Sequence, residues 1–268
     1  EGGMGQIWRA EHRLLARPAA VKLIPAELGG DEERRRRFER EARATATLNS
    51  PHTVELYDFG VDDDGTIYYV MELLEGLDLE ELVRRHGPQP PARVVHLLRQ
   101  VCDSLAEAHG RGLLHRDMKP SNIMVCPRGL SRDEVKVLDF GLVRAFGDAG
   151  KDETRLTKEE SLRGTPSYTA PEIALDEEPI DGRADLYSLA CVAYWLLTAR
   201  PPFERESPLK TLLAQVQEPP EPPSRIAPVP RELEELLLCC LAKAPQERPA
   251  DAKALERRLA ACQCSPLW

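Results

Sequence analysis

The tripeptide His115-Arg116-Asp117, followed by Lys119 and Asn122, constrains this chain more than any other feature of its sequence. It places a carboxylate, a cation and an amide within one short stretch. Transfer of a phosphoryl group needs these groups near one point, as an acceptor for a hydroxyl proton, a counter-charge for phosphate and a metal ligand. The stretch therefore predicts a phosphate-handling site around Asp117.

Further short motifs lie on both sides of this stretch. A lysine ends the apolar run Ala20-Val21-Lys22, and a second carboxylate, suited to Mg²⁺, begins Asp139-Phe140-Gly141. Ala170-Pro171-Glu172 closes the series. Each tripeptide arises by chance in a chain of this length with a probability of roughly a few per cent. Chance therefore does not explain all of them in this order.

The phrases around these motifs are typical of one family. They read GGMGQIWRAEH, YYVMELLEG, HRDMKPSNIMV and GTPSYTAPE. With them, residues 2–259 resemble the eukaryotic-type protein kinases, and in particular the bacterial Ser/Thr kinase group. The resemblance implies an α+β fold of two lobes, with a small antiparallel β lobe and one main helix at 1–74 and a larger, mainly helical lobe at 75–268. It also implies transfer of the γ-phosphate of ATP, with Mg²⁺ or Mn²⁺, to Ser or Thr of a protein substrate, which the GTPSYTAPE segment would dock.

Composition agrees with one domain of two lobes. The 268 residues carry a formal net charge of −9, which argues against nucleic acid as a partner. No run reaches about 18 apolar residues, and the longest candidate, 186–199, is predicted to be a buried core helix. The chain opens without the pattern of a signal peptide. We expect a cytoplasmic location and no membrane contact within this segment, whereas kinases of the bacterial group often carry a membrane anchor elsewhere.

The seven cysteines are scattered, mostly within apolar helical patterns. This favours reduced thiols in the core of a cytosolic protein. The alternative is a metal site at Cys262-x-Cys264, for which no matching His or Cys pair lies nearby. The cysteines are Cys102, Cys126, Cys191, Cys239, Cys240, Cys262 and Cys264.

Hydrophobic periodicity predicts strands early in the chain and helices after residue 78. The strands are expected at 6–11 and 18–24, with a hairpin at 54–61 and 66–71. A charged helix at 31–48 would be capped by Asp31. The proline-rich stretch 218–230 is predicted to be a surface connection, and a proline-motif ligand is the alternative. The other helices are expected at 79–85, 91–110, 181–199, 208–216, 231–242 and 250–262.

Gly2, Gly3 and Gly5 resemble part of a glycine-rich loop, in which backbone N–H groups approach phosphates without side-chain collision. Gly2 and Gly5 match the second and third glycines of the family pattern. The first glycine, and the first strand of the small lobe, would lie before Glu1. We therefore expect the first strand to be missing from this segment.

The resemblance assigns ATP contacts to the small lobe. Lys22 would contact the α- and β-phosphates and pair with Glu41. Helical spacing places Arg34, Arg37 and Glu41 on one face of the predicted helix. Met71 would close the back of the adenine pocket as the gatekeeper.

The resemblance also implies contacts from the connector between the lobes, residues 72–76, and from positions beyond it. Glu72 and Leu74 would bond the adenine edge through their backbones. The apolar members of the pocket could equally serve core packing, and both roles can hold together. The purine would lie between Ile7, Ala20 and Met124, and the ribose would contact Asp78.

Four residues would act on the phosphates. Asp117 would accept or orient the proton of the attacking hydroxyl, and Lys119 would stabilise the charge of the γ-phosphate. Asn122 and Asp139 would hold two Mg²⁺ ions. Lys119, together with Gly164-Thr165, resembles Ser/Thr rather than Tyr kinases.

Regulation is expected through phosphorylation within 147–164. Arg116 precedes the catalytic aspartate, and a buried arginine is costly unless an anion meets it. Arg37 and Arg144 match the other basic positions that the family uses to grip a phosphorylated loop. An acidic loop with incidental hydroxyls is the alternative. The candidate acceptors, of which we favour the second, are Thr154, Thr157 and Ser161.

Three residues resemble structural supports of the family. Glu172 and Arg248 would form a buried ion pair, and Asp185 would bond the backbone of the catalytic loop. Departures from the family pattern include a small Thr45 in the predicted helix, Ser50 for a common histidine, and a longer loop at 126–134. Thr45 is expected to weaken the packing that holds the active state.

Two other functional classes compete with an active protein kinase. A pseudokinase would bind nucleotide or partners without turnover, but every catalytic position is intact apart from the truncated glycine loop. A small-molecule kinase of the aminoglycoside type shares the two-lobe fold but lacks a segment like GTPSYTAPE. A homodimer that phosphorylates itself in trans is a further expectation.

Overall fold

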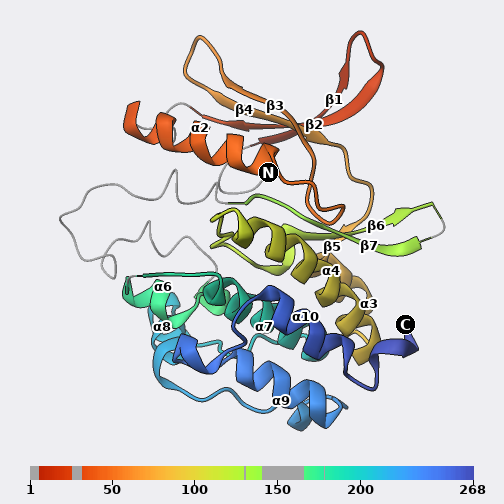
Figure 1. Cartoon of the computed structure of the whole chain (residues 1–268), viewed down its shortest axis with the longest axis vertical. Coiled ribbons are helices and arrows are strands. Elements are labelled where there is room, and N and C mark those ends of the chain that lie inside the picture. Colours follow the sequence, from red (N-terminus) through yellow and green to blue (C-terminus); the bar gives the residue numbers. More distant parts are fainter. Residues whose placement is uncertain (1–5, 26–31, 130, 141–165, 178) are drawn as a thin grey trace.

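The structure is a computed structural model that describes residues 6–25, 32–129, 131–140, 166–177 and 179–268. A small antiparallel sheet with one helix lies above a larger, mainly helical part (Figure 1). This confirms the predicted α+β class and its two-lobed architecture. The predicted boundary at 74/75 falls between the last strand of the sheet and the first short strand of the larger part.

The four strands of the small lobe are β1 (Gln6–His12), β2 (Arg17–Ile24), β3 (Leu56–Val61) and β4 (Ile67–Glu72), in the order β1-β2-β4-β3. All neighbours pair antiparallel, and the register places Ile7 opposite Lys22 and Ala20 opposite Met71. Because side chains alternate along a strand, these four side chains project from the same face of the sheet.

Helix α2 (Glu32–Ala46) packs beside this sheet. Ala42 is fully buried and joins Ile24, Ile67 and Tyr69 in the small core of the lobe. The helix ends two residues before the predicted position, because Thr47 and Leu48 turn back to bond the carbonyls of Ala44 and Thr45.

The connector leaves β4 through a tight approach at Gly76. A Cβ at this position would lie 2.2 Å from the carbonyl oxygen of Val125, so only glycine fits without displacing the neighbouring strand. The chain continues into β5 (Leu77–Asp78) and α3 (Leu79–His86). The Asp78 carboxylate caps α3 by accepting the N–H of Glu81 at 2.7 Å.

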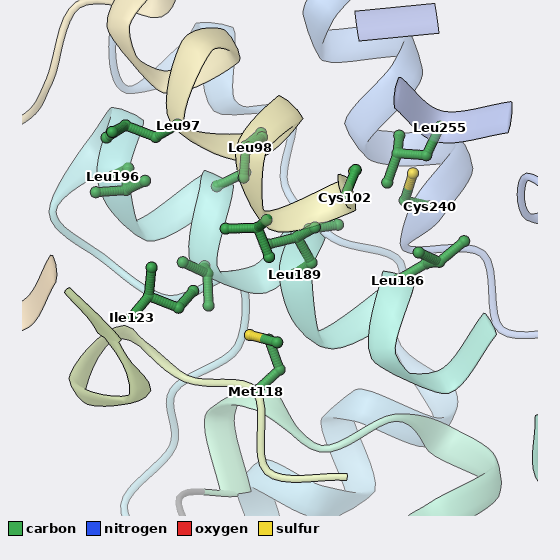
Figure 2. Packing of buried hydrophobic residues seen from close by; sticks show 14 of the residues in the cluster. Leu97, Leu98, Cys102, Met118, Ile123, Leu186, Leu189, Leu196, Cys240 and Leu255 are labelled. Atoms are coloured by element: carbon green, nitrogen blue, oxygen red, sulfur yellow. The ribbon is translucent and has the colours of Figure 1, made fainter. Parts of the chain in front are cut away.

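The core of the large lobe is built on α4 (Pro91–Gly110) and α7 (Arg183–Thr198). Figure 2 shows Leu98 and Cys102 of α4 beside Leu189 of α7. Most of α7 is buried, including all residues from Ala184 to Tyr194, which confirms the prediction of a core helix. Burial of a leucine side chain stabilises a fold by about 1.5–3 kcal/mol, so the leucines of this interface contribute to the stability of the lobe. No helix within the described part of the chain combines the length and apolar character needed to cross a membrane.

Residues 126–134, expected as a long loop, belong instead to a β-hairpin of β6 (Ile123–Arg128) and β7 (Ser131–Val137). Side chains of α4 hold the second strand. Arg93 forms a bidentate pair with Asp133 at 2.6 and 2.9 Å, and Gln100 bonds the backbone of Asp133 and Val135. Contacts from a distant helix therefore extend a hairpin that local sequence did not reveal.

The three remaining predicted helices, at 208–216, 231–242 and 250–262, are present with bounds close to those predicted. The stretch 218–230 crosses the surface with one 3-10 turn, as predicted for a structured connection. Six of the seven free cysteines are buried and Cys239 is half-buried, which confirms the expected core thiols. The elements of the large lobe not yet named are η1 (Pro120–Asn122), η4 (Pro166–Tyr168), α6 (Pro171–Leu175), α8 (Pro208–Gln217), η5 (Pro223–Arg225), α9 (Arg231–Cys240), η6 (Pro245–Glu247), α10 (Ala252–Ala260) and η7 (Ser265–Leu267).

The turn between α2 and β3 is anchored on the large lobe. The Glu107 carboxylate on α4 accepts the backbone N–H groups of Asn49 and Ser50 at 2.8 and 2.6 Å. The Ser50 hydroxyl donates to Asp103 at 2.7 Å. Ser50, which departs from the family pattern, therefore still ties the two lobes together.

Candidate active site

A buried carboxylate on α7 fixes the loop that carries Asp117. Asp185, 1% exposed, accepts the backbone N–H groups of His115 and Arg116 at 2.9 and 2.8 Å and bonds the His109 ring at 2.8 Å. Its hydrogen bonds satisfy a charge that would otherwise be costly to bury. This is the support that the resemblance implied for Asp185.

The loop backbone is strained at Arg116, whose φ of 64° lies in the left-handed region. Asp139 shares this feature with a φ of 55°. In the described part of the chain, the other non-glycine residues with positive φ end a helix or occupy a hairpin turn. Arg116 and Asp139 do neither. Strained backbone of this kind concentrates at functional sites, where the surrounding contacts hold it.

His115 joins this loop to the segment 138–140. Its Nδ1 accepts the N–H of Asp117 at 3.3 Å, so the other ring nitrogen, Nε2, donates to the carbonyl of Leu138 at 2.8 Å. Its ring lies 4.9 Å from that of Phe140, and both side chains are fully buried. The two carboxylates of the predicted site are therefore held on a shared, rigid support.

Asp117 lies between a cation and an amide. Its Oδ2 accepts from Lys119 Nζ at 2.7 Å and from Asn122 Nδ2 at 3.0 Å. Asn122 is 7% exposed and also donates to the backbone carbonyl of Asp117 at 2.8 Å. The structure thus brings together the three residues from which the sequence predicted a phosphate site.

Lys22 reaches this site from the small lobe. Its Nζ lies 2.7 Å from Asp139 Oδ2, and the two side chains are 11% and 23% exposed. Burial, and the charges of Asp139 and Glu41, raise the pKa of the nearby Tyr69 phenol far above its ordinary value. Asp139 and Glu41 therefore both lie near Tyr69. The pairing of Lys22 with Glu41 stays a prediction.

A small cavity of about 20 Å³ lies beside Asp139. The hydroxyl of Thr45 donates back to the carbonyl of Glu41 at 3.0 Å, as short polar side chains in helices commonly do. The short side chain of Thr45, which departs from the family pattern, thus borders this cavity. The lining residues are Thr45, Val54, Leu56, Tyr69, Met71, Asp139 and Phe140.

Of the predicted adenine contacts, Ala20 is nearly buried and Ile7 is 67% exposed on the same face of the sheet. Met124 pairs with Asp78 across β5 and β6, so these two residues lie at the connector. Leu74 is half-buried between β4 and β5.

Glu72 has a partner that the sequence did not suggest. Lys136 Nζ on β7 lies 2.6 Å from Glu72 Oε1, which also accepts the N–H of Glu55 at 2.8 Å. Lys136 is only 7% exposed, so this ion pair joins the connector to the large lobe inside the protein. A lysine between two valines of an apolar run was the available signal.

Below the site, Glu172 and Arg248 form a bidentate ion pair at 2.6 and 2.8 Å. The Arg248 side chain is fully buried and also donates to the carbonyls of Ala242, Arg183 and Lys243. The pair implied by the resemblance is thus present and fixes the start of α6.

Several predicted residues lie outside the described part of the chain, as does the side chain of Arg37. They comprise the glycine loop, the predicted helix cap and the regulatory segment. These residues are Gly2, Gly3, Gly5, Asp31, Arg144, Thr154, Thr157 and Ser161.

Asn122 and Asp139 fit a divalent cation. Because Asn122 donates through Nδ2, its Oδ1 is the atom left to meet a ligand. The N–H of Leu138 donates to the Asn122 carbonyl at 2.9 Å. Because Asp139 follows Leu138 in the chain, its backbone lies close to Asn122. Amide and carboxylate oxygens are the ligands that Mg²⁺ prefers.

Comparison with known proteins agrees with this geometry. Residues 1–259 match the family model described as the protein kinase domain. The chain is 40% identical to the serine/threonine-protein kinase pkn3 of Myxococcus xanthus over 97% of its own length and 48% of that protein. It is 38% identical to PknB of Mycobacterium tuberculosis over 92% of its own length and 39% of that protein. The chain thus spans less than half the length of these relatives.

Solved structures show the same likeness. The PknI kinase domain of Mycobacterium tuberculosis superimposes with a TM-score of 0.75 at 29% identity, covering 97% of this chain and 91% of that one. Rad53 in complex with AMP-PNP superimposes with a TM-score of 0.74 at 26% identity, covering 95% of this chain and 61% of that one. The fold is therefore that of a protein kinase.

The chain belongs to the protein kinase family. The relatives that it matches are named bacterial serine/threonine-protein kinases, and this likeness confirms the resemblance drawn from its motifs.

Proposed function

We propose that this domain transfers the γ-phosphate of ATP to a serine or threonine hydroxyl of a protein substrate. The observation that carries the proposal is the cluster of Asp117, Lys119 and Asn122, with Lys22 and Asp139 facing it. A carboxylate, two cations and two oxygen ligands meet there on a rigid support. The names of the relatives support the choice of Ser and Thr.

Each residue has a role that follows from its atoms. Asp117 would take up or orient the proton of the attacking hydroxyl, because its carboxylate is the acceptor at the centre of the cluster. Lys119 would move from Asp117 toward the γ-phosphate, and Lys22 would bond the other phosphates. Asn122 and Asp139 would hold Mg²⁺, which neutralises phosphate charge when bound.

The test is transfer of radiolabel from [γ-³²P]ATP to a generic protein substrate with Mg²⁺ or Mn²⁺. We expect label on serine and threonine after acid hydrolysis. A pseudokinase would bind nucleotide without transfer, and a small-molecule kinase would leave the protein unlabelled. Rad53 was solved with AMP-PNP, so that analogue is a suitable ligand for the binding control.

Asp139→Asn is expected to abolish the gain in nucleotide affinity that Mg²⁺ provides. The amide carries less negative charge toward the metal and also removes the ion pair with Lys22, which spans 2.7 Å. Calorimetric titration with AMP-PNP, with and without Mg²⁺, measures the effect. Asp58→Asn, an equal change at an exposed carboxylate on β3, should keep the metal-dependent gain. A retained gain in Asp139→Asn would exclude Asp139 as a metal ligand.

Regulation by phosphorylation within 147–164 is part of the proposal. Arg116 is half-buried beside Asp117 and offers a cation to a phosphate on this segment. Incubation with ATP should place phosphate there, with Thr157 as the favoured acceptor, and intact-protein and peptide mass spectrometry detects it. Replacing Thr154, Thr157 and Ser161 by alanine should lower activity, whereas Thr47→Ala at an exposed turn should not. Full activity of the triple variant would refute this regulation.

The cellular setting is also proposed. The domain would work in the cytoplasm, where ATP is available and thiols stay reduced. Its partners would be protein substrates and a second copy that it phosphorylates in trans.

A further inference from the structure

One side chain of the large lobe supports the predicted peptide-docking segment from behind. The 3-10 turn η4 lies within that segment and starts at Pro166, and Gln215 Nε2 on α8 donates to the Pro166 carbonyl at 3.2 Å. Gln215 is fully buried although it is a polar residue. A buried amide is retained at little cost only when its donors and acceptors are paired.

The orientation of this amide is fixed on its other side. The Tyr187 hydroxyl on α7 donates to Gln215 Oε1 at 2.5 Å, so the NH₂ group is the part that faces Pro166. Tyr187 is itself fully buried, and the Arg248 guanidinium lies 4.8 Å above its ring. The amide therefore has a single satisfied orientation, set by a rigid core helix.

The backbone of Gln215 is held as well, for a reason visible in the sequence. Its carbonyl would bond the N–H of residue 219 in a longer helix, but Pro219 has no N–H. Lys243 Nζ fills this role by donating to the Gln215 carbonyl at 2.5 Å, and it lies 4.2 Å from the centre of the Phe203 ring. The end of α8 is thus pinned between α7 and the loop after α9.

The docking segment is consequently fixed at two points. Gln215 holds Pro166 near its beginning, and Arg248 holds Glu172 at its end. Ser167, Tyr168 and Thr169 between these anchors remain half-exposed. α8 contacts both η4 and α6, and Figure 1 shows it beside α6.

We propose that Gln215 is a positioning residue for the protein substrate, because its amide, oriented by Tyr187, sets the place of Pro166 and of the half-exposed residues that follow. The proposal rests on the protein kinase activity proposed above and on the docking role that the family resemblance gives to this segment. Gln215 touches neither ATP nor the reacting atoms. Its loss should therefore act on the binding of the peptide alone.

The experiment compares steady-state kinetics of wild type, Gln215→Met and Gln215→Glu. The substrate is a synthetic peptide with one serine, selected from a degenerate peptide array by the wild-type enzyme. Methionine keeps the volume but loses the donor, and glutamate turns an oxygen toward the Pro166 carbonyl. Loss of one hydrogen bond at a buried carbonyl is expected to raise the KM for the peptide about five- to tenfold, with the KM for ATP unchanged within about twofold.

Thr211→Val is the matched control on the same helix. Thr211 is 3% exposed, and its hydroxyl bonds Arg205 and Ser207 but not the docking segment. This variant should lose a similar buried hydrogen bond without moving the KM for the peptide. A parallel rise of both KM values in Gln215→Met, or an unchanged KM for the peptide, would overturn the proposal.

Hydrogen exchange separates this proposal from the activity itself. Amides of residues 166–175 should exchange faster in Gln215→Met than in wild type or Thr211→Val, and this readout needs no turnover. If both Gln215 variants fail to fold, Tyr187→Phe replaces them, because it keeps the ring but removes the hydroxyl that orients the Gln215 amide. The proposal then requires that this variant raise the KM for the peptide. A wild type without any transfer would refute the proposed activity, while exchange would still decide the role of Gln215.

Discussion

Asp117→Asn is expected to lower turnover by on the order of 10²-fold or more while nucleotide binding stays nearly intact. The amide keeps the shape of the carboxylate, and its oxygen can still accept from Lys119 or from Asn122. It cannot take up a proton from the attacking hydroxyl. The loss therefore falls on the chemical step rather than on the binding of ATP.

Single-turnover kinetics and calorimetry with AMP-PNP measure the two parts separately. The control is Asp103→Asn, an equal change on α4, where the exposed carboxylate accepts the hydroxyl of Ser50. This control should keep turnover within about twofold, because surface hydrogen bonds contribute little. Turnover like that of wild type in Asp117→Asn would remove Asp117 from the reaction and return the pseudokinase to consideration.

The part of the site that could be predicted is the part encoded in contiguous motifs. Asp117, Lys119 and Asn122 lie in one loop, so their mutual geometry follows from local sequence once the loop is anchored. The core helix α7 could be predicted equally well, because an apolar run of that length favours a buried helix. Both predictions depended on signals within about twenty residues.

The rest depended on pairings between distant residues. Lys136 meets Glu72 across 64 positions, and Gln215 meets Pro166 across 49. A lysine in a strand and a glutamine in a helix usually face solvent, so the residue types did not indicate either partner. The apolar neighbours of Lys136 indicated its burial but not its pairing with Glu72. The hairpin at 126–134 was missed for the same reason, since Arg93 of α4 holds its second strand. Tertiary contacts that satisfy buried polar groups are thus the features that local pattern does not specify.

Arg248→Met is expected to destabilise the domain by about 3–5 kcal/mol, because it leaves the buried carboxylate of Glu172 without its counter-charge. Three backbone carbonyls also lose their donor. For a domain of this size the melting temperature should fall by roughly 6–20 °C. Differential scanning calorimetry measures the effect.

The control for this prediction is Arg99→Met, which breaks the ion pair with Glu256. Those side chains are 42% and 32% exposed, and such a surface pair contributes about 0–1 kcal/mol. The double variant Glu172→Gln with Arg248→Met should lose less than the sum of the single losses, since each change removes the penalty left by the other. If Arg248→Met melts within about 2 °C of wild type, the ion pair is not what secures Glu172. Of the two anchors, Gln215 and Arg248, only Gln215 would then hold the docking segment. Hydrogen exchange at 166–175 in Arg248→Met would accordingly remain at the wild-type rate.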